Sequence, residues 1–379
     1  MKNYYIGIMS GTSLDGIDAV LAEISDDGKL KVLAHADIPM DASLRQTYFQ
    51  LQKSSENELH HEALAANQLA IHYGLVVEKI LKIANLKASD IQAIGAHGQT
   101  IRHQPGLHDG IGYTLQSLNP ALLAEKTSIN VVANFRTRDI AAGGQGAPLV
   151  PSFHWSQFAQ PEATAVLNIG GISNLSLLPG LKNASDQELV SGFDCGPGNA
   201  LMDQWALQSI NKPFDNGGEW AAQGQVIEKL LLSLLSDPFF KKAPPKSTGR
   251  DLFNADWLNH HLAVTESKTR SPVDIQATLL ALTGQSIAQS LIEYAPLTKK
   301  LVICGGGSKN KYLINTLQSL CPFLVSPIET TEKFGIDPQA VEAAAFAWLA
   351  WSHQVKRPAN LPAVTGARGL RVLGAHYPT

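Results

Sequence analysis

Short apolar runs separated by polar turns fill the first part of the chain. Tyr4 to Met9, Ile17 to Ile24 and Leu30 to Ile38 each have the length and apolar content of a buried strand, and Asp26-Asp27-Gly28 separates the last two. Neighbouring strands joined by short turns pair in antiparallel fashion. The pattern therefore predicts a three-stranded antiparallel meander.

Helical periodicity follows this meander. Asp41 can cap a short helix, and apolar residues recur at helical spacing from Glu58 to Leu86. Ile91 to Ala96 then returns to a strand, which ends in His97-Gly98-Gln99-Thr100, and Asn119 to Lys126 is again helical. Strands interleaved with helices in this way indicate the α/β class.

The second half of the chain repeats the order of the first. Three strands are predicted again, at Ala163 to Asn168, Leu175 to Leu178 and Leu189 to Phe193. The glycine turn Gly170 to Ser173 follows the first of them. Three helices are predicted later in the chain, at Ala200 to Ile210, Ile275 to Tyr294 and Gln339 to Trp351. A further strand, Leu301 to Cys304, comes directly before Gly305-Gly306-Gly307. This repetition predicts two α/β domains related by pseudo-duplication, residues 1–142 and 143–357, with 358–379 returning to the first domain as an open alternative.

Charge and composition limit which binding partners and which cellular compartment are expected for this protein. The formal net charge is −3, which gives no field for attracting nucleic acid or an anionic membrane. The three cysteines form no C-x-x-C pair, as is typical of a reducing compartment. No signal-peptide pattern opens the chain, and the apolar segment Ala343 to Trp351 is much shorter than the roughly 20 residues of a membrane span. These features predict a cytoplasmic protein.

The first turn, Gly11 to Asp18, has the chemistry of a phosphate-binding turn. Glycine lets the backbone approach a ligand, and successive N–H groups with the Thr12 and Ser13 hydroxyls supply donors for a polyanion. An ordinary hairpin turn is the alternative, but the matching turn at Gly170 favours the ligand. The chain has no P-loop, no G-x-G-x-x-G after the first strand and no protein-kinase signature, so a nucleotide would bind between hairpins.

Several long motifs in a fixed order resemble one family. The chain is similar to the actin-like, sugar-kinase and Hsp70-type ATPases and, within them, to the anhydro-N-acetylmuramic acid kinases. The motifs that carry the resemblance are Met9 to Asp18 (MSGTSLDGID), His97 to Thr100 (HGQT), Arg136 with Gly143 to Pro148 (GGQGAP), Asn168 to Asn174 (NIGGISN) and Asp194 to Asn199 (DCGPGN). Asn134 departs from the pattern, in which an acidic residue is expected, and this puts a contact to Arg136 in doubt.

The resemblance implies two actin-like (ribonuclease H-like) domains with ATP in an interdomain cleft. The implied ATP-binding residues come from two hairpin turns and an adenosine loop: Gly11, Thr12, Ser13, Leu14, Asp15, Gly16, Ile17, Asp18, Gly170, Gly171, Ile172, Ser173, Gly305, Gly306 and Gly307. Mg²⁺ would accompany the phosphates, with Asp15 and Asp18 as the nearest carboxylates. Stabilisation of the turn is the alternative role for both. A homodimer is also implied.

The implied reaction converts ATP, water and 1,6-anhydro-N-acetylmuramic acid into N-acetylmuramic acid 6-phosphate and ADP, as part of peptidoglycan recycling. Water must attack the anomeric carbon, so a base is required, and Asp194 is the candidate because it comes just after the third strand and just before a glycine turn. A local hydrogen bond to the turn is the alternative. The implied substrate-binding residues are His97, Gln99, Arg136, Asn174 and Glu342.

Several roles stay open at this point. Arg136, with Arg102 behind it, would hold the lactyl carboxylate of the substrate, but either could instead be a surface arginine paired with Asp139 or Glu125. Glu342 could face the substrate or solvent. The stretch Pro244 to Arg250 is interpreted as a surface loop, with contact to substrate or a partner subunit as the less favoured reading.

Three other functions compete with this reading of the chain: a nucleotide-switched actin- or Hsp70-like binding protein, another sugar kinase, and a hydrolase that uses Asp194 and Glu342.

Overall fold

The computed structural model describes residues 3–11, 14–182 and 184–379, and the chain forms two compact units. Unit 1 comprises Met1–Gln157, Phe334–Ile336 and Ala340–Thr379, and unit 2 comprises Phe158–Lys333 and Asp337–Gln339. The division thus falls later than the expected 142/143, and the returning segment begins before residue 358. The expected cleft between the domains stays a prediction.

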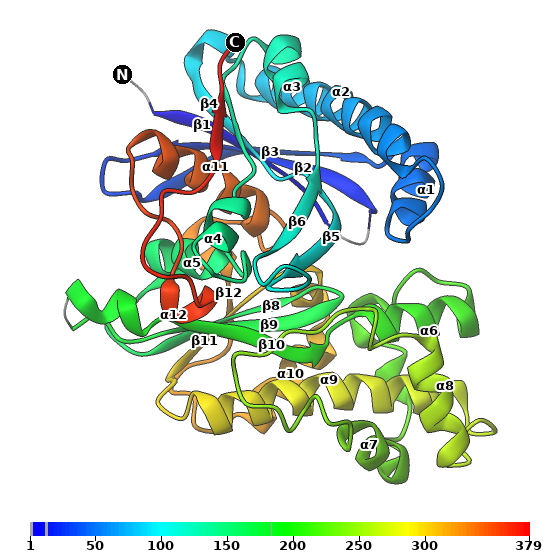
Figure 1. Cartoon of the computed structure of the whole chain (residues 1–379). Helices are drawn as coiled ribbons and strands as arrows, with labels where there is room; N and C mark the ends of the chain where they lie inside the picture. Colours follow the sequence, from blue (N-terminus) through cyan, green and yellow to red (C-terminus); the bar gives the residue numbers. More distant parts are fainter. Residues whose placement is uncertain (1–2, 12–13, 183) are drawn as a thin grey trace. The chain divides into compact units, whose positions relative to one another are not determined.

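Unit 1 contains a six-stranded mixed sheet in the order β13-β7-β4-β1-β2-β3 (Figure 1). Strands β1 to β3 are the predicted antiparallel meander, and β4 and β7 add to it in parallel. The bounds are β1 Tyr4–Ser10, β2 Gly16–Ile24, β3 Leu30–Pro39, β4 Ile91–Ala96, β7 Val131–Ala133 and β13 Ala375–Tyr377. A separate antiparallel ribbon, β5 Gln99–Pro105 and β6 Gly112–Ser117, was not predicted.

Helices cover both faces of this sheet (Figure 1). Ile6 and Ile8 of β1 pack with the apolar residues of α2 in one core, whereas Gly7 between them faces α11, as the alternation of a strand requires. The helices of unit 1 are α1 Ala42–Leu51, α2 Glu58–Ala84, α3 Pro120–Thr127, α4 Thr137–Ala141, α5 Val150–Phe158, α11 Val341–Gln354 and α12 Pro362–Thr365.

Packing explains where unit 1 ends. The Phe153 ring of α5 lies 6.1 Å from the Trp348 ring of α11, so both helices belong to the same core. The glycine-rich segment at 143–148 also belongs to unit 1, because Asp139 accepts hydrogen bonds from the Gly146 N–H, the Asn360 side chain and the Thr365 hydroxyl, each at 2.8 Å. That buried carboxylate joins the segment to the returning part of the chain.

Unit 2 contains a five-stranded mixed sheet in the order β10-β9-β8-β11-β12. Its three antiparallel strands followed by parallel ones match the arrangement β3-β2-β1-β4-β7 of unit 1, which confirms the α/β class and the repeated topology. The bounds are β8 Thr164–Ile169, β9 Ile172–Leu178, β10 Ser191–Pro197, β11 Lys300–Cys304, β12 Glu329–Thr330, α6 Ala200–Ile210, α7 Glu228–Leu235, α8 Ala255–Val264, α9 Pro272–Tyr294 and α10 Lys311–Leu320.

The predicted boundaries are wrong around β10. Residues 184–189 form a short 3₁₀ helix, and β10 runs on through the glycine turn to Pro197. Asp194 therefore lies within the third strand and not after it. The extra residue that makes this possible is Cys195, because the pairing to β9 shifts between Asp194 and Gly196.

Candidate active site

Asp194 is held by a loop from elsewhere in unit 2. Its Oδ2 accepts a hydrogen bond of 2.9 Å from the Thr248 N–H, and its own N–H donates to the Lys246 carbonyl at 3.1 Å. Burial raises the pKa of the Asp194 carboxyl to about 6, and the bond from Thr248 opposes this only in part. A carboxylate with such a pKa ionises near neutral pH and accepts a proton readily, as a general base must.

The two glycine segments of unit 2 lie side by side. A Cβ built on Gly305 would come within 2.3 Å of the Asn168 Oδ1, and one on Gly307 within 2.3 Å of the Ile169 side chain. Gly305 also has a φ of +81°, which favours glycine. Since Asn168 and Ile169 directly precede the Gly170-Gly171 turn, the structure brings both predicted ATP segments of unit 2 to one end of the sheet. Ile172 and Ser173 begin β9 and are not part of the turn itself.

Polar side chains form a row across this end of the sheet. Asn174 pairs directly with Asn168 on one side and with Asp194 on the other. Residues directly opposite one another in a sheet point to the same face. The predicted substrate ligand Asn174 is thus beside the predicted base.

The first predicted phosphate turn lies in unit 1, between β1 and β2. The Leu14 N–H donates to the Gly11 carbonyl at 3.1 Å, and Leu14 is buried with a φ of +57°. Gly16, Ile17 and Asp18 belong to β2. Thr12 and Ser13 lie outside the described residues.

The two candidate metal carboxylates have different surroundings. Asp15 is exposed at the end of the turn, and its Oδ1 accepts from Arg45 at 3.2 Å. Asp18 lies on β2 and contacts the His35 ring at 3.1 Å. Oxygen donors suit Mg²⁺, which usually takes only one or two carboxylates in addition to phosphates and water. Both residues fit that chemistry, although the described residues contain no cluster of three or more acidic, histidine or cysteine side chains that could hold a metal by itself.

The buried His97 and the partly buried Arg136 form a polar pair in unit 1. The Arg136 Nε donates to the His97 Nε2 at 3.1 Å, and its Nη1 donates to the Gly146 carbonyl at 2.9 Å. Burial, with a smaller effect of Arg136, lowers the pKa of His97 well below its usual value. The ring is therefore neutral, and since Nε2 accepts, its proton is on Nδ1. Burial also lowers the pKa of Arg136 to about 10, which still leaves it charged at neutral pH, and Glu342 of α11 opposes that lowering.

Gln99 belongs to a second buried network beside this pair. Its Oε1 accepts from the Ser10 hydroxyl at 2.9 Å, and Ser10 lies 3.0 Å from the Tyr73 hydroxyl. Tyr73 in turn donates to the His97 carbonyl at 2.6 Å. Of the four predicted substrate ligands in unit 1, His97 and Arg136 are in direct contact, and Gln99 is linked to His97 through Ser10 and Tyr73. Glu342 lies close enough to Arg136 to raise its pKa.

The structure decides between several alternatives left open by the sequence. Arg102 forms an ion pair with Glu58 at 2.8 Å, and not with the Asp139 or Glu125 that the sequence analysis considered. Arg136 does not use Asp139, whose two oxygens accept from other groups. Asn134 has a φ of +57°, a conformation that asparagine tolerates, and its side chain accepts from Thr137 at the start of α4.

The sequence analysis did not identify the residues that contact the site from distant positions in the chain. Thr248 and Lys246 contact Asp194 across more than 50 intervening residues, and Tyr73 comes from the middle of α2. No local pattern could have identified them. The run PKSTGR at Pro245 to Arg250 is the one available signal, because its glycine and hydroxyl residues resemble those of the predicted turns.

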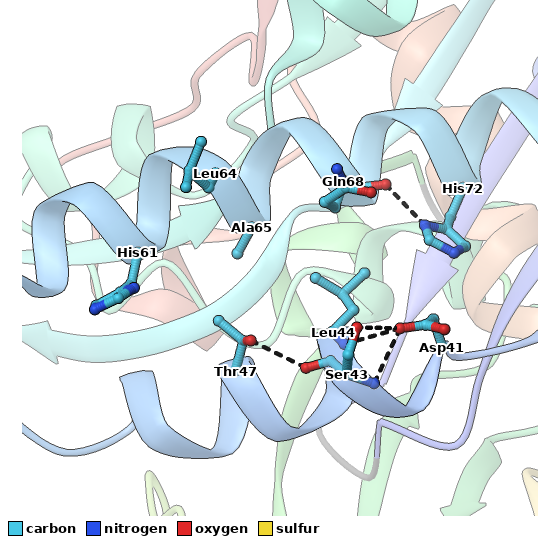
Figure 2. A pocket seen from close by; sticks show the side chains of 9 residues that line it. All are labelled: Asp41, Ser43, Leu44, Thr47, His61, Leu64, Ala65, Gln68 and His72. Atoms are coloured by element: carbon cyan, nitrogen blue, oxygen red, sulfur yellow. Dashed lines mark hydrogen bonds between the residues drawn. The ribbon is translucent and has the colours of Figure 1, made fainter.

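A pocket of about 410 Å³ in unit 1 lies elsewhere, between α1 and α2, and no predicted site residue lines it (Figure 2). Its polar groups are occupied by their own helices: Asp41 caps α1 through the Ser43 and Leu44 N–H groups, and the His72 ring contacts the Gln68 carbonyl. The predicted cap at Asp41 is confirmed, and the pocket contributes nothing to the candidate site.

Among the described residues, no helix is both long enough and apolar enough to cross a membrane.

Comparison with known proteins gives consistent results over the whole chain. A family model described as anhydro-N-acetylmuramic acid kinase matches residues 3–379. Proteins described as anhydro-N-acetylmuramic acid kinase from Cupriavidus pinatubonensis and Albidiferax ferrireducens are 54% and 50% identical, covering 99% and 100% of this chain and 98% and 100% of their own lengths.

Among solved structures, the activator of the 2-hydroxyisocaproyl-CoA dehydratase from Clostridium difficile with bound ADPNP is similar at a TM-score of 0.44 and 12% identity, over 93% of this chain and 96% of that one. The family model and the full-length relatives agree with each other. The chain therefore belongs to the anhydro-N-acetylmuramic acid kinase family and is a phosphotransferase.

Proposed function

We propose that this chain uses ATP and water to open 1,6-anhydro-N-acetylmuramic acid and phosphorylate its O6, giving N-acetylmuramic acid 6-phosphate and ADP in peptidoglycan recycling. Membership of the family supports the substrate and the type of reaction. The observation that carries the chemistry is Asp194, a partly buried carboxyl with a pKa of about 6 beside two adjacent glycine segments.

Asp194 acts as the base for ring opening. It takes a proton from water as the water oxygen bonds to the anomeric carbon, and the bond from that carbon to O6 breaks. O6 keeps the electrons of that bond and then bonds to the γ-phosphorus, while the bond from the γ-phosphorus to the β,γ-bridging oxygen breaks and its electrons leave with ADP. The Thr248 N–H holds the Asp194 carboxylate in one orientation throughout.

Main-chain N–H groups at Gly11 and Gly171 bind the phosphates, with the Gly170 N–H closing the turn on the Ile172 carbonyl, and Gly305 to Gly307 lie against the adenosine. Mg²⁺, held by Asp15 or Asp18 together with the phosphates, would neutralise charge on the transferred group. Arg136 offers a fixed cation for the lactyl carboxylate, and its bond to His97 holds its Nε in place. Gln99, Asn174 and Glu342 provide hydrogen-bonding groups for the sugar.

The activity should depend on pH through Asp194. Its pKa is raised to about 6, so the carboxylate becomes protonated, and loses its function as base, as the pH falls through that value. We expect kcat/KM to be flat near neutral pH and to fall about tenfold per pH unit below about pH 6. A profile measured from pH 5 to 8 with saturating ATP tests this. A rate that stays constant down to pH 5 would contradict it.

A coupled assay of ADP release tests the proposed function as a whole. The anhydro sugar should give rapid ADP release, and glucose, glycerol or no sugar should give little. Equal activity on glucose or glycerol would indicate a general sugar kinase, slow release without any sugar would indicate a nucleotide switch, and ring opening without ATP would indicate a hydrolase.

We also propose that the protein is a cytoplasmic homodimer. Light scattering of the purified protein tests its oligomeric state.

A further inference from the structure

The loop at Pro244 to Arg250 is fixed against β10 at two places. Its backbone meets Asp194 through the Lys246 carbonyl and the Thr248 N–H. The Lys246 ammonium also lies over three aromatic rings, at 5.0 Å from the centre of Phe239, 5.5 Å from Tyr294 and 5.9 Å from Phe193. A cation over several ring faces is held by their quadrupoles. The loop is thus anchored at Lys246 and Thr248, and it lies at the surface, as predicted, with Pro245, Ser247 and Arg250 exposed.

Arg250, at the end of this loop, lies beside the glycine turn of unit 2. A Cβ built on Gly171 would be 3.4 Å from the Arg250 Nη2 and 3.5 Å from its Nε, which is ordinary van der Waals contact. The same Cβ would be 3.6 Å from the Ala200 side chain at the start of α6. The guanidinium therefore lies directly over the turn at which the phosphates of ATP are expected to bind.

No acidic side chain among the described residues pairs with the Arg250 guanidinium. Within the part of the chain that the structure describes, it forms no ion pair and no side-chain hydrogen bond, and only its carbonyl is used, by the Asn254 side chain. The Gly171 N–H beside it likewise has no backbone acceptor among those residues. An arginine with all its donors available, next to an available main-chain donor, is suited to an anion with several oxygens.

We propose that Arg250 is a catalytic residue that contacts the transferred phosphoryl group of ATP. This rests on the proposed function. Arg250 follows Thr248 by only two residues, and the Thr248 N–H donates to Asp194, so one short loop both carries the guanidinium and holds the proposed base. Charge on the phosphoryl oxygens and on the leaving oxygen of ADP must be stabilised during transfer, and a planar guanidinium can donate to two oxygens at once.

Two variants and a matched control test the role of Arg250. Arg250→Ala should lower kcat for anhydro-sugar-dependent ADP release by about 10²-fold, and Arg250→Lys, which keeps the charge and loses the paired donors, should recover only part of it. Calorimetry should show weaker binding of the non-hydrolysable analogue β,γ-imido-ATP to Arg250→Ala, by more than about tenfold, with ADP affinity within about twofold of wild type. Arg270→Ala, at an exposed arginine before α9, should match wild type in every measurement.

Each result decides the proposal. A kcat for Arg250→Ala within about threefold of wild type, or equal losses of affinity for ADP and for the analogue, would overturn it and leave the proposed function intact. If the wild type and Arg270→Ala release no ADP with the anhydro sugar, the proposed function itself fails and this inference with it. Added guanidinium should restore part of kcat to Arg250→Ala and none to Asp194→Asn, which separates a missing cation from a distorted loop.

Discussion

Asp194→Asn should lower sugar-dependent ADP release by about 10²- to 10⁴-fold, the usual contribution of a positioned general base. The amide has nearly the same shape as the carboxylate and can still accept from the Thr248 N–H, but it cannot take a proton from water. The binding of ATP should persist, because Asp194 is not among the proposed phosphate ligands. Steady-state kinetics and calorimetry with ATP, measured on the same preparation, check both parts.

Asp256→Asn provides the matched control. It makes the same chemical change at an exposed carboxylate in the first turn of α8, and it should leave kcat unchanged. If Asp194→Asn retains kinetics within a few-fold of wild type, Asp194 is not the base. Asp194 would then serve only to stabilise the local structure through its hydrogen bond from Thr248, which is the alternative given in the sequence analysis.

Gly95→Val should destabilise unit 1 by more than about 3 kcal/mol. A Cβ at this position would come within 2.0 Å of the Phe346 carbonyl, and one at Gly7 within 1.8 Å of the Ala343 carbonyl. Both strands therefore lack a side chain where the backbone of α11 lies against the sheet. Overpacking a core typically costs about 1–3 kcal/mol even when side chains can adjust, and here the contact is with helix backbone. Chemical denaturation monitored by circular dichroism measures the loss.

Gly74→Ala is the control for this substitution. Gly74 lies inside α2, and a Cβ there would meet nothing closer than the Lys126 side chain at 3.8 Å. Alanine should therefore stabilise the helix by about 0.5–1 kcal/mol. If Gly95→Val is as stable as wild type, α11 does not pack on β4 as described, and the placement of Glu342 near Arg136 loses its support.

Strong periodicity made much of the fold predictable from sequence. The meander β1 to β3 and the long helices α2 and α9 were predicted nearly to their ends, because their apolar residues follow one period over many positions. The ribbon β5–β6 was missed because its residues are mostly polar and half-exposed, so they show no clear alternation. The unit boundary was misplaced because the contact of α5 with α11 joins distant parts of the chain.

The residues proposed for the candidate site came from sequence motifs, but the contacts that connect them could not be predicted. Glycine turns and a carboxylate could be read from the motifs, since the chemistry of these residue types is local. The raised pKa of Asp194 depends on burial, the lowered pKa of His97 depends on burial and to a smaller extent on Arg136, and the position of Arg250 depends on a loop that folds back to β10. These properties arise from tertiary contacts, and no single stretch of sequence contains them.

The discontinuity of unit 1 sets an order of assembly during synthesis. Unit 2 is almost one continuous stretch, so it can form its core as soon as that stretch has left the ribosome. Unit 1 must wait for α11 and for the edge strand β13, which pairs with β7. Until then one face of its sheet stays uncovered, and Arg136 lacks the neighbouring carboxylate of Glu342. A nascent chain can therefore complete unit 2, which carries the proposed base, well before unit 1, which carries the proposed sugar ligands Arg136 and Glu342.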